Sequence, residues 1–434
     1  ANGRGVVALG ETAVIDLDGR WANQRLDGGA GSAQAWINGG RVQLESSHDV
    51  SLAAGSRISV DAGGRVDLQG KASAGKGGDI ALLADSSQVT TDGSGRLQLD
   101  GRLSGLGGTG AGTLQLATGG KVTLADRARD DGSLWLSPTL LRSGFGQYDI
   151  NGHAGLEVAD GTQLDVRAPT LRVRQAAADA ATAGEGLEAW TAPLYAFDPG
   201  SGSVTQRQGA SVLLRSQRNT LGGDVRIGSN AVVQVDAGQS IELRGGGNID
   251  VAGALIAKAG SIRLDDVRDN QQRYQIGGTP LRYRIGSNAL LDVSGDSFAA
   301  EDAAGRHQGV LHSGGSIGIG GTLDWESRDA LENRPPDAFV VVERGAVLDA
   351  SGTRETLTVD GSGTRSVASD GGTIVLRSAN GLYLDGTLRA AAGGVGAQGG
   401  TLGVAFGGGV YERRAGAAEL GPRAITLVQQ SSDA

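Results

Sequence analysis

Arginine and aromatic residues occur together in two parts of this sequence. In the first part, Arg172 and Arg174 occupy alternate positions, so their side chains would point to the same face of a strand. In the second part, Arg282 and Arg284 repeat this spacing on either side of Tyr283. Guanidinium groups bind anions through several N–H donors, and aromatic rings offer flat faces for stacking. The combination favours binding of anionic or neutral sugars.

The predicted ligand-binding set contains Arg, Trp and Tyr residues of these two parts of the chain. A solvated strand face on which arginines pair with the excess of acidic residues would give the same pattern. The sequence leaves both interpretations open. The residues of the set are Trp135, Tyr148, Arg172, Arg174, Trp190, Tyr195, Arg282, Tyr283 and Arg284.

Three other patterns approach known sites, and each misses a required feature. Residues 70–77 nearly spell a phosphate-binding loop, but Gly77 stands where Ser or Thr must hold magnesium. Residues 245–250 give one imperfect copy of a calcium nonapeptide, which works only in tandem. His307 and His312 are five positions apart, unlike the zinc-binding HExxH spacing. The chain has no Cys for thiolate ligands, so we predict neither a metal nor a cofactor.

The composition limits the possible partners. The 434 residues include 76 Gly, 8 Pro, no Cys and no Met, and the net charge is −9. Nucleic-acid binding requires a basic surface, so we expect no nucleic-acid partner. The sequence lacks an apolar run of about 18 residues, which predicts no transmembrane helix. Residues 1–5 resemble neither an initiator Met nor a signal peptide, and we expect a processed or excised piece of a longer protein.

A short stretch of sequence recurs three times. Ile-Gly-Ser-Asn-Ala occurs at 227–231 and at 285–289, and Arg-Gly-Ala at 344–346 introduces a third copy. The Ala residues of the copies are 58 and 57 positions apart, and the Gly-Gly pairs at 39–40 and 77–78 are 38 apart. These spacings predict three turns and two turns of a solenoid with about 19 residues in each turn.

Apolar and polar residues alternate between the glycines, which predicts short strands. The Gly-Gly pairs predict corners with positive φ. Two-residue hairpins at 100–101 and 385–386, both Asp-Gly, are a local alternative. The nearly constant period favours parallel coils instead, with small apolar side chains filling one interior column. The predicted fold class is therefore all-β, a single parallel β-helix.

Two windows interrupt this pattern and are predicted to be extra-helical insertions. Together they contain 11 of the 16 aromatic residues and 7 of the 8 prolines. An Ala-rich stretch in the first, 175–189, is the best helical candidate of the chain. Insertions in repeat proteins map to loops on one face, often the binding face. The predicted segments are coils at 1–125, an aromatic and Pro-containing insertion with coils at 126–220, coils at 221–264, a second insertion region at 265–340, and coils at 341–434.

The pattern resembles a known family. A Gly-Gly-x-Ile/Val-x-Leu strand, a Leu-Asp-Gly-x-Leu strand, an Ala/Gly-rich stretch and a second Gly-Gly pair follow one another at 371–404. Related patterns occur at 77–116 and 140–166. This order is similar to that of large exoproteins of the filamentous haemagglutinin type, which Gram-negative bacteria export by two-partner secretion. The resemblance implies a right-handed parallel β-helix and export through an outer-membrane transporter. The Asn-Pro-rich secretion domain of the family is not found, so an internal or C-terminal part of the rod is expected.

The resemblance implies a segment of a secreted, cell-surface or matrix-associated adhesin that forms a rod for adhesion or biofilm. Exopolysaccharide and host or bacterial cell surfaces are the expected partners. Open β-edges at the ends of a rod also predict self-association. One alternative is a polysaccharide-processing enzyme, but acids such as those at 130–131 and 265–266 form no column on consecutive coils. We therefore predict no enzyme. The other alternative is a spacer without a ligand site.

Overall fold

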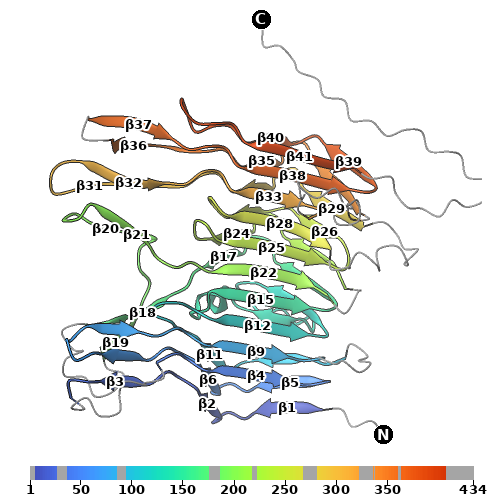
Figure 1. Cartoon of the computed structure of the whole chain (residues 1–434). Helices are drawn as coiled ribbons and strands as arrows, with labels where there is room; N and C mark the ends of the chain where they lie inside the picture. Colours follow the sequence, from blue (N-terminus) through green and yellow to red (C-terminus); the bar gives the residue numbers. More distant parts are fainter. Residues whose placement is uncertain are drawn as a thin grey trace, which may run out of the picture.

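The computed structural model describes residues 5–26, 37–85, 94–174, 186–217, 222–266, 281–321, 336, 338–359 and 363–406. These residues form strands β1 to β41 and one short 3-10 helix, η2 (Pro138–Arg142). Figure 1 shows the coils stacked in chain order, with β1 near one end of the rod and β39 to β41 near the other. The prediction of a parallel β-helix is confirmed, because long sheets are built from parallel strands of successive coils.

The first face of the rod is a ten-stranded parallel sheet. It contributes the longest strands, and neighbouring strands come from successive coils. Its strands are β4 (Arg41–Glu45), β9 (Asp79–Leu83), β12 (Thr113–Thr118), β15 (Gln147–Gly152), β22 (Ser211–Ser216), β25 (Ser240–Gly245), β28 (Ser261–Asp266), β33 (Ser316–Ile319), β38 (Thr373–Ser378) and β41 (Thr401–Phe406).

The second face follows the first along each coil and carries eight strands in one sheet. They are β14 (Leu134–Leu136), β13 (Lys121–Leu124), β16 (Gly155–Val158), β23 (Val225–Ile227), β26 (Ile249–Val251), β29 (Leu281–Ile285), β34 (Ala338–Val342) and β39 (Gly381–Leu384). Closer to the N-terminus, β1 (Val6–Leu9), β5 (Asp49–Leu52) and β10 (Leu97–Leu99) form a separate three-stranded sheet that occupies the same place in their coils.

The third face closes each coil. Its main sheet contains β17 (Gln163–Val166), β24 (Val232–Val235), β27 (Ala254–Ile256), β30 (Leu290–Asp292), β35 (Val347–Asp349) and β40 (Thr387–Arg389). A three-stranded sheet of β2 (Val14–Asp16), β6 (Arg57–Ser59) and β11 (Arg102–Ser104) takes this place in the N-terminal coils.

The predicted coil length is wrong, because every coil on the first face is longer than we expected. Val42 pairs directly with Ile80, so the strands after the first two Gly-Gly pairs are one coil apart rather than two. The shortest coil on this face runs from Ile241 to Ile262. The first two copies of the recurring stretch are two coils apart, because β24 pairs with β27 and β27 with β30. The second and third copies are only one coil apart, because β30 pairs with β35.

The recurring stretch marks a turn rather than a constant period. In each copy the backbone N–H of the Ala donates to a carbonyl oxygen three positions earlier, as from Ala231 to Gly228 at 3.2 Å. The equivalent bonds run from Ala289 to Gly286 and from Ala346 to Glu343. Asn230, with φ of 58°, and Gly345, with φ of 95°, hold the left-handed position of this turn. The turn joins the second face to the third, and the sequence repeats it because the corner repeats.

The Gly-Gly pairs precede strands of the first face and are needed for a different reason than predicted. A Cβ atom on Gly78 would lie 1.8 Å from the backbone oxygen of Gly40 in the neighbouring coil. A Cβ on Gly372 would lie 1.9 Å from the oxygen of Gly315. None of these four glycines has the positive φ that we expected. Close approach of stacked backbones therefore selects glycine here.

The segments that leave the coils are shorter than the two predicted insertion windows. Five antiparallel hairpins of the described residues leave the corner between the third face and the first, and Figure 1 shows β18–β19, β20–β21, β31–β32 and β36–β37 on one side of the rod. Other strands of the two predicted windows, including β15 to β17 and β29 to β30, belong to the coils. The hairpins are β7 (Gly64–Val66) with β8 (Ala72–Ala74), β18 (Thr170–Val173) with β19 (Leu187–Trp190), β20 (Tyr195–Asp198) with β21 (Ser203–Gln206), β31 (Ser297–Glu301) with β32 (His307–Leu311), and β36 (Arg354–Thr358) with β37 (Thr364–Ala368).

The helix predicted at 175–189 is wrong at its C-terminal end. Residues 187–189 belong to β19, which pairs antiparallel with β18. Residues 175–185 lie outside the described residues. Cross-strand pairing with β18 explains why the Ala-rich composition did not decide the local structure.

We expect Gly372→Ala to destabilise the rod by about 1–3 kcal/mol, because the added methyl group must push two stacked backbones apart. Gly10→Ala is the matched control, since a Cβ there meets nothing within 4 Å. Urea unfolding followed by circular dichroism would compare the midpoints of both variants with that of the unchanged protein. Equal midpoints for the two variants would contradict the close-approach argument.

Candidate functional site

The structure separates the predicted ligand-binding residues into buried and exposed groups. Tyr148 and Tyr283 are both 0% exposed and lie in the apolar core. Tyr148 stacks between Leu114 and Val212 in the inward column of the first face. The prediction that these two tyrosines contact a ligand is therefore wrong. The alternation that places one residue of a strand outward places its neighbour inward.

Three of the predicted residues meet on the hairpin formed by β18 and β19. The guanidinium carbon of Arg172 lies 4.5 Å from the centre of the Trp190 ring. Glu188 forms ion pairs with Arg172 and, at 3.7 Å, with Arg174. Trp190 is 37% exposed. The hairpin therefore presents an aromatic and cationic surface, and its acidic residue compensates part of the positive charge.

Tyr195 lies on β20 and joins two hairpins. Its hydroxyl donates a hydrogen bond of 2.6 Å to Asp296, at the base of the β31–β32 hairpin. The ring stacks on Phe298, with centroids 5.2 Å apart, and on His312, at 6.3 Å. Burial and the neighbouring Asp296 carboxylate together raise the pKa of Tyr195. Tyr195 therefore connects two hairpins, and Phe298 and His312 cover part of its ring.

The three remaining residues of the predicted set lie on the second face. Trp135 on β14 donates its indole N–H to the backbone oxygen of Ala125 at 2.8 Å, which fixes the ring. Arg282 on β29 donates its backbone N–H to the side chain of Asn248 at 3.0 Å. Arg284 follows on the same strand and belongs to an ion-pair network on the outer surface.

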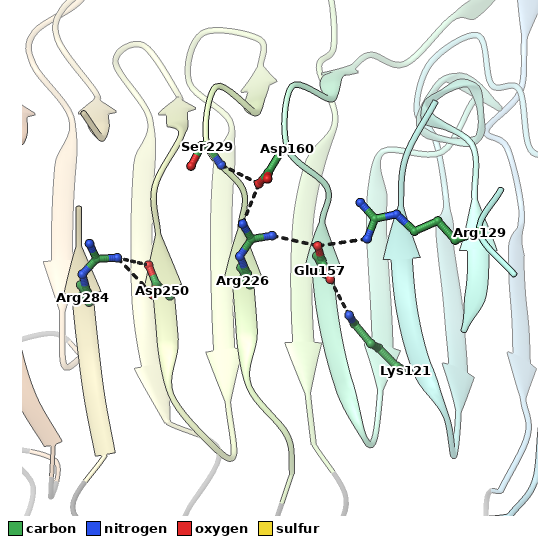
Figure 2. Close-up of polar contacts among 8 residues, drawn as sticks. All are labelled: Lys121, Arg129, Glu157, Asp160, Arg226, Ser229, Asp250 and Arg284. Atoms are coloured by element: carbon green, nitrogen blue, oxygen red, sulfur yellow. Dashed lines mark hydrogen bonds and ion pairs between the residues drawn. The ribbon is translucent and has the colours of Figure 1, made fainter. Parts of the chain in front are cut away.

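Arg284 also belongs to an in-register column of alternating charges on four neighbouring strands. Glu157 is in register with Arg226 across β16 and β23, Arg226 with Asp250 across β23 and β26, and Asp250 with Arg284 across β26 and β29. Arg284 donates to Asp250 at 2.9 Å and to Glu343 at 2.6 Å. Figure 2 shows these residues side by side on neighbouring strands, and their side chains are partly exposed. Residues in register on neighbouring strands lie close enough for opposite charges to stabilise the pairing.

Glu157 is the centre of the ion pairs at one end of this column. Its carboxylate binds Lys121, Arg129 at 3.3 Å and Arg226 at 2.8 Å. Figure 2 shows these three contacts. The side chain of Glu157 is only 10% exposed. Burial alone would raise the pKa of Glu157. The hydrogen bond from Lys121 and the three positive charges outweigh burial and hold the pKa below its ordinary value. Glu157 is therefore a charged residue at neutral pH and connects three strands with one loop.

Arg226 extends the network to the next corner. Its second nitrogen binds Asp160 at 2.6 Å, and Asp160 also accepts the backbone N–H of Ser229 at 2.9 Å (Figure 2). The hydrogen bonds from Arg226 and Ser229 lower the pKa of Asp160. The charged column is thus joined to the turn that recurs in the sequence.

The prediction from sequence missed the acidic half of this network. A signal was present, because each of the four strands contains a triplet with a charged residue between two apolar residues, and the sign of that charge alternates from coil to coil. The triplets are Leu156-Glu157-Val158, Val225-Arg226-Ile227, Ile249-Asp250-Val251 and Tyr283-Arg284-Ile285. With the shorter, constant period that we assumed, these triplets could not be aligned.

The candidates for metal or acid-base chemistry do not come together. Asp131 lies in the exposed loop after β13, whereas Asp265 and Asp266 end β28 several coils away. Within the described ranges, no three His, Asp or Glu side chains are placed to hold a metal ion. No helix in the described part of the chain is long and apolar enough to cross a membrane.

Comparisons with protein-family models, with curated proteins and with solved structures found no match for this chain. The resemblance to exoproteins of the filamentous haemagglutinin type therefore depends on the order of turns and strands in the sequence. The structure adds the parallel β-helix.

Replacing Glu157 by Gln should lower stability by about 1–2 kcal/mol, because three cations lose their shared counter-charge. Asp385→Asn is the control. It removes the partner of Arg344 in a pair whose side chains are 85% and 63% exposed, and we expect a change of less than about 0.5 kcal/mol. Thermal unfolding at low and at high salt would measure both effects.

The unchanged protein and the Glu157→Gln variant also allow a test of the pH dependence of stability. The pKa of Glu157 is lowered in the folded state, so its contribution is complete above the unfolded value of about 4.3 and is lost as the pH falls through the folded pKa. The unfolding midpoints of the unchanged protein and of Glu157→Gln should therefore converge below about pH 4. A constant difference between them down to pH 2 would contradict the assignment.

Proposed function

We propose that this chain is a rod segment of a secreted or surface-associated bacterial adhesin, and that the hairpins on one flank of the rod contact the ligand. The observation that carries the proposal is that all five hairpins leave the same corner of the coil. A rod whose projections share one flank can present several contacts to one surface at once, and linked contacts strengthen binding without new chemistry.

Three of the hairpins pack against one another and form a lateral array. Besides the Tyr195–Asp296 bond, the backbone N–H of Ala303 donates to the oxygen of Pro199 at 3.0 Å. Ser297 donates to Glu355 at 3.1 Å, and the backbone N–H of His307 donates to Thr358 at 2.9 Å. These contacts join β20–β21 to β31–β32, and β31–β32 to β36–β37. The array is therefore fixed in the folded state, which reduces the entropy lost when a ligand binds.

The chemistry of the flank supports a carbohydrate or cell-surface ligand. The β18–β19 hairpin presents Trp190 with Arg172, and an amphipathic ring beside a guanidinium offers both stacking and hydrogen bonding. The sequence resemblance supports a location outside a Gram-negative cell and an outer-membrane transporter as the export partner. Together these observations favour adhesion over an enzyme on the same fold.

The proposal predicts that binding is lost when residues of the hairpins are replaced and the coils are left unchanged. The purified chain should bind intact bacterial or host cells or bacterial exopolysaccharide. Arg172→Ala combined with Trp190→Ala should weaken that binding at least tenfold, as should replacement of residues 298–310 by a short Gly-Ser turn. The second replacement keeps the hairpin base, where the backbone N–H of His312 donates to the backbone oxygen of Asp296 at 2.8 Å.

Arg344→Ala is the matched control for this experiment. Arg344 is equally cationic and highly exposed, but it lies at the corner between the second and third faces. Its loss should leave binding unchanged. If the intact chain binds neither cells nor exopolysaccharide while its circular dichroism is β-rich, the segment is a spacer and the proposal fails.

Self-association is a further expectation of this proposal. Strongly exposed apolar side chains gather on the terminal coils, where Val6 and Val14 are 59% and 63% exposed at one end and Tyr383 and Leu402 are 60% and 50% exposed at the other. Val14→Asp with Tyr383→Asp should therefore lower the apparent mass at high concentration. Sedimentation velocity would measure it, and a monomer at every concentration for the unchanged chain would contradict the expectation.

A further inference from the structure

The second face of the rod is interrupted between β10 and β14. In the described residues β10 pairs with β5, and β14 pairs with β13, but the two strands belong to separate sheets. A pocket of about 490 Å³ opens at this seam. Its walls come from β10 and the residues beside it, from the end of β12, from β14 and from the loop between β13 and β14.

The seam has an identifiable cause. After β13 a loop returns the chain to the start of this strand, and β14 pairs parallel to β13, with Val122 opposite Leu134. The next element, η2, begins at Pro138 and places Leu141 in the core, so this coil has no strand on the third face. Both the second and the third faces therefore change sheet at this coil. The pocket exists because one coil departs from the three-strand plan.

The lining of the pocket combines one aromatic ring with balanced polar groups. The ring is the indole of Trp135, whose N–H is already bound to Ala125. Arg96, Gln98 and Asp100 on and beside β10 supply donors and acceptors, and Leu99 is half-buried. One Arg and one Asp leave this set without net charge.

A neutral sugar ring fits this chemistry. The C–H groups on one face of a pyranose are apolar and can stack on an indole, while the hydroxyl groups are both donors and acceptors. Ligand sites are typically concave, largely apolar and provided with a few placed polar groups. A phosphate or an acidic polysaccharide would instead need an excess of positive charge, and the carboxylate of Asp100 opposes it.

The loop that closes the pocket is held in place by the charged column. Arg129 of this loop binds Glu157 at 3.3 Å (Figure 2). Asp131 accepts the backbone N–H of Ser133 at 3.0 Å and its hydroxyl at 2.5 Å, and Ser133 lines the pocket. Such contacts pre-organise the wall, which lowers the entropic cost of binding. Glu157 is thus a positioning residue for this pocket.

We propose that the pocket between β10 and β14 binds one neutral sugar unit of a polysaccharide or glycan, with Trp135 stacking on the ring and Arg96, Gln98 and Asp100 binding its hydroxyl groups. This site is independent of the adhesive flank proposed above, because it lies on the second face, whereas the hairpins leave the corner between the third face and the first.

The test uses the whole chain on an array of neutral and acidic oligosaccharides, followed by calorimetry with the best neutral binder. Neutral hexose-containing oligosaccharides should bind in preference to acidic ones. Gln98→Ala and Asp100→Asn alter exposed side chains and should each weaken binding at least tenfold while the circular dichroism spectrum is retained. Gln115→Ala, on the ten-stranded sheet, is the matched control and should bind as the unchanged chain does.

Trp135→Phe keeps a ring but removes its N–H bond to Ala125, and should weaken binding less than Trp135→Ala does. The chain without residues 298–310 should keep this binding even where it has lost adhesion to cells, which separates the two proposals. Binding of acidic oligosaccharides alone, no binding of any neutral sugar, or unchanged affinity in both Gln98→Ala and Asp100→Asn would overturn the inference.

Discussion

The hydrogen-bonded stacking of parallel strands, about 4.8 Å apart, is the constraint on which the rest of this structure depends. It aligns each residue with its equivalent in the next coil, so side chains form columns rather than isolated contacts. An inward column must be apolar throughout, as in the series Ile241, Ile262, Ile317 and Ile374. An outward column of like charges would repel itself. The alternation from Glu157 to Arg284 avoids this repulsion, and Glu343 supplies a second acceptor for Arg284.

One outward pair shows what happens when like charges do stack. Asp292 and Asp349 are in register on β30 and β35. Burial would raise the pKa of Asp292, but hydrogen bonds from Lys258 and Ser294 lower it overall. Lys258 comes from the preceding coil and lies 2.6 Å from the carboxylate. The ladder therefore tolerates a repeated carboxylate where a cation from a neighbouring coil compensates it.

Because the ladder fixes the strands, variation is confined to the corners, and this explains both the success and the failures of prediction from sequence. The alternation of apolar and polar residues within a strand shows which of its side chains point inward, so the strands and the parallel β-helix could be predicted. The coil length could not, because two hairpins at one corner lengthen the coil from Tyr148 to Val212, whereas the coil from Ile241 to Ile262 contains no hairpin. The error in period then hid the charged column.

The ligand residues were predicted less well for a related reason. An aromatic residue in a strand gives the same sequence pattern whether its side chain points into the core or toward solvent. Tyr148 and Tyr283 point into the core. Arg172 and Trp190 were predicted to lie in one segment, but their contact depends on the antiparallel register of β18 with β19. The pattern within either strand does not contain that register, since it is fixed by the pairing between the two strands.

The position of the pocket follows from the same constraint. Along an unbroken ladder the backbone groups bond to neighbouring coils, and the outward side chains bond to one another, so few polar groups remain for a ligand. A concave site needs a place where the stacking changes. In the described part of the rod, the coil that contains β14 and η2 provides one, and two sheets end there. The Arg129–Glu157 ion pair then ties the irregular loop to the regular column beside it. A change in that column, far from any hairpin, would therefore alter the pocket before it altered the adhesive flank.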